Sequence, residues 1–93
     1  MKILHLTLKK EWFQKIATGQ KTEEYREPKP YWQARLEGRE YDVIYIRNGY
    51  SKNAPCMCVE WLGCEKRPPL PDGFGANYGS LYAIKLGKIK SIT

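Results

Sequence analysis

The segment YDVIYIRN (Tyr41–Asn48) is the clearest strand of this sequence and sets the strongest limit on its fold. Valine, isoleucine and tyrosine favour extended backbone, and the Asn-Gly pair that closes the segment is a turn signal. A second strand is predicted in CMCVEWL (Cys56–Leu62), ended by Gly63. A last strand is predicted in LYAIKLGKI (Leu81–Ile89), with a bulge or bend at Gly87. The second half of the chain therefore predicts a sheet.

The first part of the chain predicts a strand and a helix in direct succession. KILHLTL alternates well enough for a strand over about Lys2–Leu6. From Leu8 to Ala17 the apolar residues follow helical spacing, with Thr7 as the expected N-cap and Gly19 as the left-handed stop.

The same succession repeats after the helix. KTEEYRE (Lys21–Glu27) predicts a strand that Pro28 ends, and PYWQARLEG predicts a short helix with Pro30 at its start and Gly38 past its end. The order is thus strand, helix, strand, helix and three strands. We expect a single α+β domain over residues 1–93, with a curved and mostly antiparallel sheet and two early helices.

The charge of the chain favours an anionic partner. It has 16 Lys and Arg against 10 Asp and Glu, a formal net charge of +6. Such an excess attracts nucleic acids and nucleotides, although many small basic domains bind nothing acidic. No apolar stretch approaches the roughly 20 residues that span a bilayer, and the start MKILHLTLKK does not read as a signal peptide. We therefore expect no membrane partner and a cytoplasmic location.

The cysteines do not form a metal-binding pattern. Cys56, Cys58 and Cys64 lack a fourth ligand at the spacing of a zinc knuckle, and the only histidine, His5, is far away in the sequence. Free thiols are the default without an export signal. Cys56 and Cys58 share one face of their strand and are interpreted as small core residues, and His5 is interpreted as a structural histidine. No metal and no cofactor is expected.

The segment TGQKTEEYRE (Thr18–Glu27) gathers charges of both signs. Lys21 is a mobile point charge suited to a phosphate or a base carbonyl, and Arg26 offers a planar fork for phosphate or a guanine edge. Glu24 and Arg26 share a face of a regular strand, so the carboxylate can orient the guanidinium. Lys21 joins them only if the Gly19 turn bends the chain. The alternative is a surface ion pair of little energetic consequence.

The spacing Gly19-x-Lys21-x-x-Glu24-x-Arg26 after an amphipathic helix resembles the signature of ASCH domains (activating signal cointegrator homology), a branch of the PUA-like superfamily. LHLTLKKEWFQKIATG, YDVIYIRNGY and YAIKLGKI are similar too, so the resemblance spans nearly the whole chain. It implies a small PUA-like β-barrel with a cleft beside the first helix. It also implies binding of RNA or a nucleotide-like ligand, with Lys21 lining the cleft and Glu24 and Arg26 at the remaining motif positions.

The same resemblance implies an enzymatic alternative, because some members hydrolyse RNA or modified nucleosides. Lys21 would then be the activating group and Glu24 the acid or base. Members that remove the acyl group from acetylated cytidine place a threonine two residues before the motif arginine, where this chain has Glu24. Thr22 directly follows Lys21 and would project to the other face of a regular strand, so acyl removal is not expected.

Aromatic residues supply the second half of the predicted nucleotide site. Six lie in or near segments expected to flank the cleft: Tyr25, Tyr31, Trp32, Tyr50, Phe74 and Tyr78. A base stacked on such a ring contributes roughly 1–3 kcal/mol. Tyr50 and Tyr78 are preferred because loop tips are exposed, whereas Trp12 and Phe13 are assigned to the core. Packing at the barrel mouth is the alternative for any of the six rings.

The segment KRPPLPDGFGANYGS (Lys66–Ser80) is predicted to be a long loop, because its prolines and glycines cannot sustain a regular element. We interpret it as a lid over the cleft with Lys66 and Arg67 near a phosphate; a static plug is the alternative. The predicted ligand-binding residues are therefore Lys21, Glu24, Arg26, Tyr50, Lys66, Arg67 and Tyr78.

Overall fold

The computed structural model describes all residues from Met1 to Thr93. In chain order, the elements are β1 (Ile3–Leu8), α1 (Lys10–Ala17), β2 (Glu23–Arg26), α2 (Pro30–Leu36), β3 (Val43–Asn48), β4 (Cys56–Arg67), the 3-10 helix η1 (Ala76–Tyr78) and β5 (Leu81–Ile92). The predicted order of strand, helix, strand, helix and three strands is confirmed. None of the helices has the length and apolar character needed to cross a lipid bilayer.

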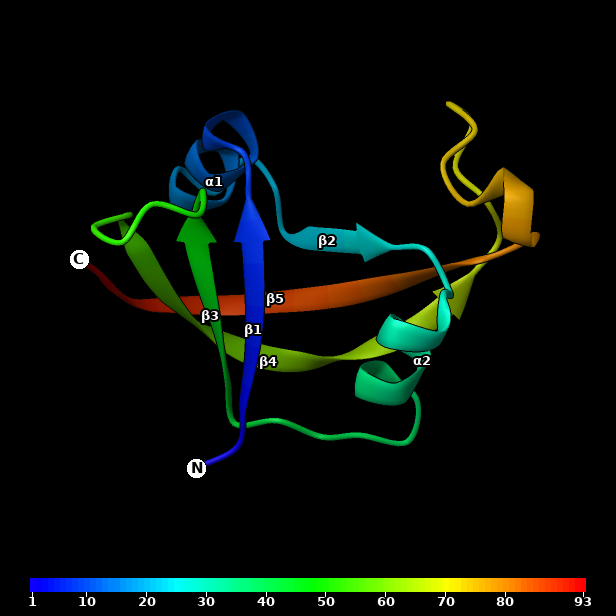
Figure 1. The fold of residues 1–93 in the computed structure, drawn as a ribbon, viewed down its shortest axis with the longest axis horizontal. Coiled ribbons are helices and arrows are strands. Elements are labelled where there is room, and N and C mark those ends of the chain that lie inside the picture. The colour runs from blue at the N-terminus through cyan, green and yellow to red at the C-terminus, as the bar shows by residue number, and fades with distance from the viewer.

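The five strands form one sheet that curls like half a barrel, in the order β1-β3-β4-β5-β2. β1 pairs with β3 in parallel, and the other neighbours pair antiparallel, as expected for a mostly antiparallel α+β sheet. Figure 1 shows β1 and β3 running across the direction of β4 and β5, which reflects the strong curl. β1 and β2 are joined through α1, yet they form the two opposite edges of the sheet.

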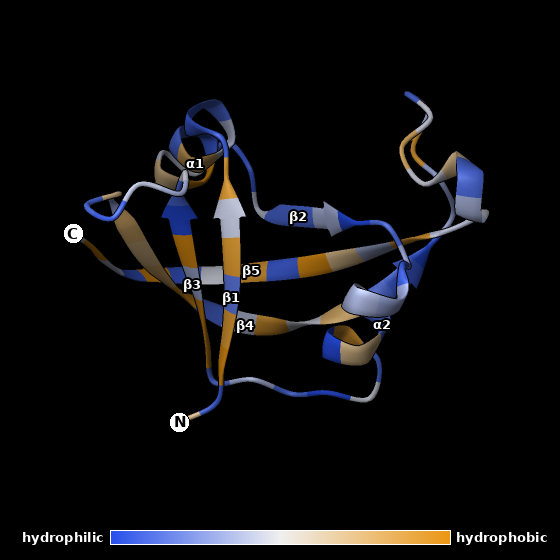
Figure 2. Ribbon diagram, in the orientation of Figure 1, coloured by the Kyte–Doolittle hydropathy of each residue, from blue (hydrophilic) through white to orange (hydrophobic).

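One apolar core lies inside the curl. Its buried side chains come from β1, α1, α2, β3, β4 and β5, and they are Leu4, Leu6, Leu8, Phe13, Ile16, Leu36, Ile44, Ile46, Met57, Val59, Trp61, Tyr82, Ile84 and Leu86. In Figure 2 apolar residues run through β1, β3 and β5, whereas β2 is mostly hydrophilic. Side chains alternate between the two faces of a strand. The leucines of β1 therefore enter the core, while His5 and Thr7 project from the opposite face of the strand.

β4 and β5 are longer than the sequence predicts. β4 does not end at Gly63 but continues to Arg67, because β5 keeps pairing with it beyond the glycine through several register shifts. One shift falls at Gly87, where the predicted irregularity is confirmed. Lys66 and Arg67 therefore belong to a strand, and the prediction that the loop begins at Lys66 was wrong.

Two further local predictions were wrong. Thr7 is not the N-cap of α1 but part of β1, and Lys9 takes the cap position. Cys56 and Cys58 are half-buried rather than core residues, because Met57 and its neighbours on the opposite face of β4 point into the core. All three cysteines are free thiols, and burial raises the pKa of Cys64 to about 11, which keeps that thiol protonated at neutral pH.

Candidate functional site

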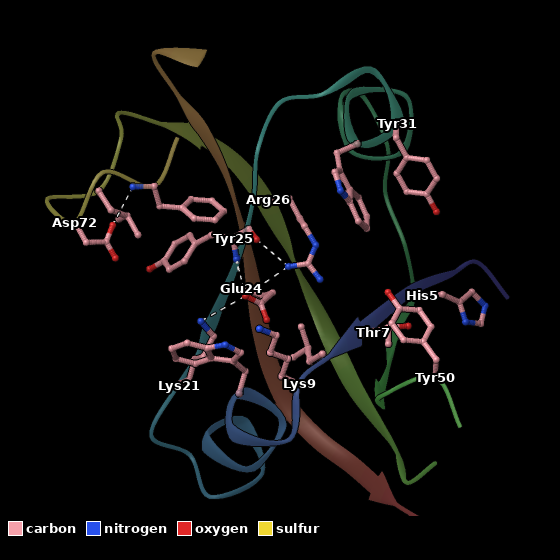
Figure 3. A pocket seen from close by; sticks show the side chains of 15 residues that line it. His5, Thr7, Lys9, Lys21, Glu24, Tyr25, Arg26, Tyr31, Tyr50 and Asp72 are labelled. Carbon is pink, nitrogen blue, oxygen red and sulfur yellow. Dashed lines mark hydrogen bonds and ion pairs between the residues drawn. The ribbon is translucent and has the colours of Figure 1, made fainter. Parts of the chain in front are cut away.

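A cavity of about 740 Å³ lies between the two edge strands of the sheet, and its walls come from β1, α1, β2, α2 and the segments that connect the elements (Figure 3). The lining residues are His5, Thr7, Leu8, Lys9, Trp12, Lys21, Glu24, Tyr25, Arg26, Tyr31, Trp32, Tyr50, Leu70, Asp72 and Phe74. The curl of the sheet brings β1 and β2 to the same cavity, so side chains from distant parts of the sequence converge there.

The turn after α1 aims Lys21 into this cavity. Gly19 has a φ of +80°, a left-handed conformation that glycine adopts at little cost. The backbone N–H of Lys21 then donates to the carbonyl of Lys15, at 3.1 Å. β2 begins only at Glu23, so Lys21 precedes the strand. Its side chain can therefore point to the same side as Glu24, which the alternation within a regular strand would not allow. The bend that Lys21 needs to reach Glu24 is therefore present, and its Nζ lies 3.5 Å from Glu24 Oε1.

Glu24 is the one buried charged residue of the chain, with 7% of its surface exposed. Its Oε1 accepts the backbone N–H of Tyr25 at 3.0 Å and lies 3.5 Å from both Lys21 Nζ and Arg26 Nη1. Its Oε2 is buried and has no hydrogen-bond partner in the protein. Buried polar atoms in proteins are almost always paired, so an unpaired carboxylate oxygen beside a cavity is suited to accept a ligand donor.

Aromatic rings hold the ammonium group of Lys21. Its Nζ lies 5.0 Å from the centre of the Trp12 ring and 5.1 Å from the centre of the Tyr25 ring. These are distances at which a cation is attracted to a ring face. The long lysine side chain is thus restrained by two rings and by the carboxylate of Glu24.

Arg26 is restrained in a similar way from the other side of Glu24. Its guanidinium lies 5.0 Å from the centre of the Trp32 ring, and its Nη1 donates to the carbonyl of Tyr25 at 2.8 Å. Burial lowers the pKa of Arg26, and the carboxylate of Glu24 opposes that shift. An arginine remains charged in proteins, so the cavity holds two fixed cations around one carboxylate.

Behind Tyr25, an ion-pair network fastens β2 to β4. The Tyr25 hydroxyl donates to Glu23 Oε1 at 2.9 Å, and Arg67 Nη1 donates to the same oxygen at 2.7 Å. Arg67 also donates to Glu65, which pairs with Lys85 at 3.3 Å. Because β2 is a short edge strand, this network helps to fix the Tyr25 ring at the cavity wall.

The network predicts a stability difference that depends on pH. The hydrogen bond from Arg67 lowers the pKa of Glu23 below its ordinary value of 4.5. A carboxyl group with a lowered pKa stabilises the folded state above its unfolded pKa, and this contribution is lost as the pH falls through the folded value. Glu23→Gln should therefore be less stable than wild type at pH 7, and the difference should shrink below about pH 4.5. Urea denaturation of both proteins between pH 3 and 7 measures it; a constant difference would contradict the role assigned to this pair.

The structure brings together four of the seven predicted binding residues, Lys21, Glu24, Arg26 and Tyr50. Lys66, Arg67 and Tyr78 do not line the cavity. The extension of β4 carries the first two into ion pairs, Lys66 with Glu37 at 3.3 Å and Arg67 with Glu23. Tyr78 lies in the exposed η1, so none of these three residues adds to the wall of the cavity.

Phe74 is the aromatic residue that the long loop presents to the cavity. Its backbone N–H donates to Asp72 Oδ1 at 3.0 Å, and its ring centre lies 6.4 Å from that of Tyr25. The next residue, Gly75, has a φ of +86°, and a Cβ there would lie 2.7 Å from the carbonyl oxygen of Ser80. Only glycine fits this close approach, which fixes the path of the loop beside Phe74.

Sequence reasoning missed Trp12, Thr7 and His5. Trp12 was assigned to the core, but it is 39% exposed and lines the cavity, whereas Phe13 is buried as predicted. Neighbours in a helix point about 100° apart, so Trp12 lies at the margin of the apolar face that Phe13 and Ile16 bury. His5 is exposed at the cavity with its ring edge-on to Tyr45, on the face of β1 opposite Leu4 and Leu6 as the alternation predicts.

No group of three or more His, Cys, Asp or Glu side chains is arranged to hold a metal ion. Comparisons with protein-family models, with curated proteins and with solved structures found no match to this chain. The function is therefore inferred from the chemistry of the cavity and from the resemblance carried by the sequence.

Proposed function

We propose that this chain is an ASCH domain of the PUA-like type, and that its cavity binds one unpaired nucleotide of an RNA or a nucleotide-like ligand. The observation that carries the proposal is the cluster of Lys21, Glu24 and Arg26 beside the aromatic walls of one cavity. The half-barrel sheet and the position of the cavity beside α1 agree with what the sequence resemblance implies.

The aromatic residues suit the flat face of a base. Tyr50 is 91% exposed and Phe74 is 38% exposed, and they reach the cavity from different loops. Neither ring has a cation of the protein near its face, whereas Trp12, Tyr25, Tyr31 and Trp32 each do. Tyr50 and Phe74 are therefore the rings on which an unstacked base can lie, and such stacking contributes about 1–3 kcal/mol.

The charges suit the rest of a nucleotide. Lys9 lines the cavity and is exposed, so its ammonium group is available to a phosphate. The net charge of +6 attracts the RNA backbone from a distance. Single-stranded RNA is favoured over duplex because a base must be unpaired and unstacked to enter the cavity.

Binding should be weak and sensitive to salt. Each counterion released from a single strand contributes about −0.7 to the slope of log affinity against log salt concentration. Titrating the protein with fluorescently labelled six-nucleotide RNAs at several salt concentrations measures affinity and slope. A duplex of matching sequence is the control and should compete poorly. If no RNA binds even at low salt, RNA is not the partner.

The contact between Lys21 and Glu24 also supports a second candidate function, that of a hydrolase. The two groups are 3.5 Å apart, so a lysine and a carboxylate are available for proton transfer at a bound ligand. Thr22 is exposed and outside the cavity, which gives no support to acyl removal.

Incubating the protein with RNA and with acetylated cytidine, and following the products, tests the hydrolase candidate. If there is turnover, Glu24→Gln should abolish it in a variant that circular dichroism shows to be folded, and turnover that survives both Lys21→Ala and Glu24→Gln would remove these roles.

A further inference from the structure

The polar groups at the cavity form an ordered array. Lys21 and Arg26 lie on either side of Glu24 in Figure 3, and each approaches the same carboxylate oxygen at 3.5 Å. Lysine and arginine only donate hydrogen bonds, and a carboxylate only accepts them. A ligand that meets these three side chains therefore faces a donor, an acceptor and a donor in that order.

Each member of the array keeps capacity for a ligand. The polar contact of Lys21 Nζ is the ion pair with Glu24, and the hydrogen bond of Arg26 uses Nη1 and leaves Nη2 and Nε. Glu24 Oε2 is buried without a partner, in a residue that is more than nine-tenths buried. The rings of Trp12, Tyr25 and Trp32 restrain the two cations, so the array does not have to be ordered by the ligand.

The complement of this array is an edge that reads acceptor, donor, acceptor. The imide edge of uracil has this order, because its N3–H lies between the O2 and O4 carbonyls. Guanine presents two adjacent donors on the same edge, so its amino group would face a cation. Neutral cytosine presents a donor followed by two acceptors, and its central ring nitrogen would face the carboxylate. In adenine the amino group and its two flanking ring nitrogens do not lie along one edge.

We infer that the cavity selects uracil among the RNA bases, with N3–H donating to Glu24 and the two carbonyls accepting from Lys21 and Arg26. This inference rests on the proposed function and specifies the ligand of that same cavity. It assigns Lys21 and Arg26 to the base edge, and leaves the phosphate to Lys9, the third cation that lines the cavity.

Changes made in the RNA test this inference without altering the fold of the protein. Labelled six-nucleotide RNAs carrying uridine, 3-methyluridine or 5-methyluridine at all positions are titrated with the wild-type protein at low salt. The 3-methyl group removes the imide donor and leaves a buried acceptor unpaired, so affinity should fall about tenfold or more. The 5-methyl group has the same size but lies away from the imide edge, so affinity should stay within about threefold. A cytidine oligomer should also bind at least about threefold more weakly than the uridine oligomer.

The outcomes separate this inference from the function on which it rests. Equal binding of the uridine and 3-methyluridine oligomers would overturn the selection of uracil and leave RNA binding intact. An equal loss with both methylated oligomers, or a preference for cytidine, would also overturn it, since the imide edge would not be what is read. If no oligomer binds at low salt, the proposed function itself fails and the inference falls with it.

Discussion

Glu24→Gln is expected to lower the free energy of unfolding by about 2–4 kcal/mol, because it removes the charge that balances two partly buried cations. The side chains of Lys21 and Arg26 are each only 17% exposed, so water screens them poorly once the carboxylate is gone. Glutamine has nearly the same shape as glutamate, so a loss of packing is not part of the effect. The partial exposure of the two cations places the value below that of a fully buried pair.

Urea denaturation followed by circular dichroism measures this change, and Glu27→Gln is the matched control. Glu27 pairs with Lys29 at 3.6 Å in the same segment, but these side chains are 30% and 54% exposed. An exposed pair of this kind contributes less than about 1 kcal/mol. Adding Lys21→Met to Glu24→Gln should recover part of the loss, since one unbalanced cation is removed. Equal effects of Glu24→Gln and Glu27→Gln would show that Glu24 does not balance the cations of the cavity.

Replacing Lys21 and Arg26 together should weaken binding of single-stranded RNA about 100-fold, with Lys21→Met and Arg26→Gln each contributing about tenfold. Each side chain is expected to donate a charge-assisted hydrogen bond to the ligand, and each is restrained before the ligand arrives. A single replacement leaves Glu24 paired with the remaining cation, so the single variants should stay folded. Circular dichroism of the double variant checks that its fold is intact before the affinity is compared.

Lys15→Met is the control for charge. Lys15 lies over the Trp12 ring at 4.9 Å, as Lys21 does at 5.0 Å, but Lys15 does not line the cavity. It should change affinity by less than about threefold, because it alters the long-range attraction alone. If Lys15→Met weakens binding as much as Lys21→Met, the cavity is not the binding site. The salt slope adds a second readout: it should stay nearly constant in the cavity variants if they contact the base, and should fall by about 0.7 per residue if they contact phosphate.

Local patterns in the chain were sufficient to predict the elements and the charged part of the site. The apolar spacing from Leu8 to Ala17, the stop at Gly19 and the strand YDVIYIRN depend on neighbouring residues, and such short-range preferences are readable without the fold. The cluster of Lys21, Glu24 and Arg26 was predictable for the same reason. The three side chains come from one turn and the short strand that follows it. The bend at Gly19 that the sequence analysis required is present, and it brings Lys21 to Glu24.

The walls of the cavity depended on contacts between distant segments, which no local pattern specifies. The curl of the sheet brings β1 and β2 to one cavity. It adds Trp12, which the sequence pattern assigned to the core, to the rings of Trp32 and Phe74 that were expected to flank the cleft. The pairing of β4 with β5 beyond Gly63 decided that Lys66 and Arg67 lie in a strand and not beside a ligand. Prolines and glycines indicate where regular structure is weak, but partner strands determine where it ends, because backbone hydrogen bonds across a sheet outweigh the preference of single residues.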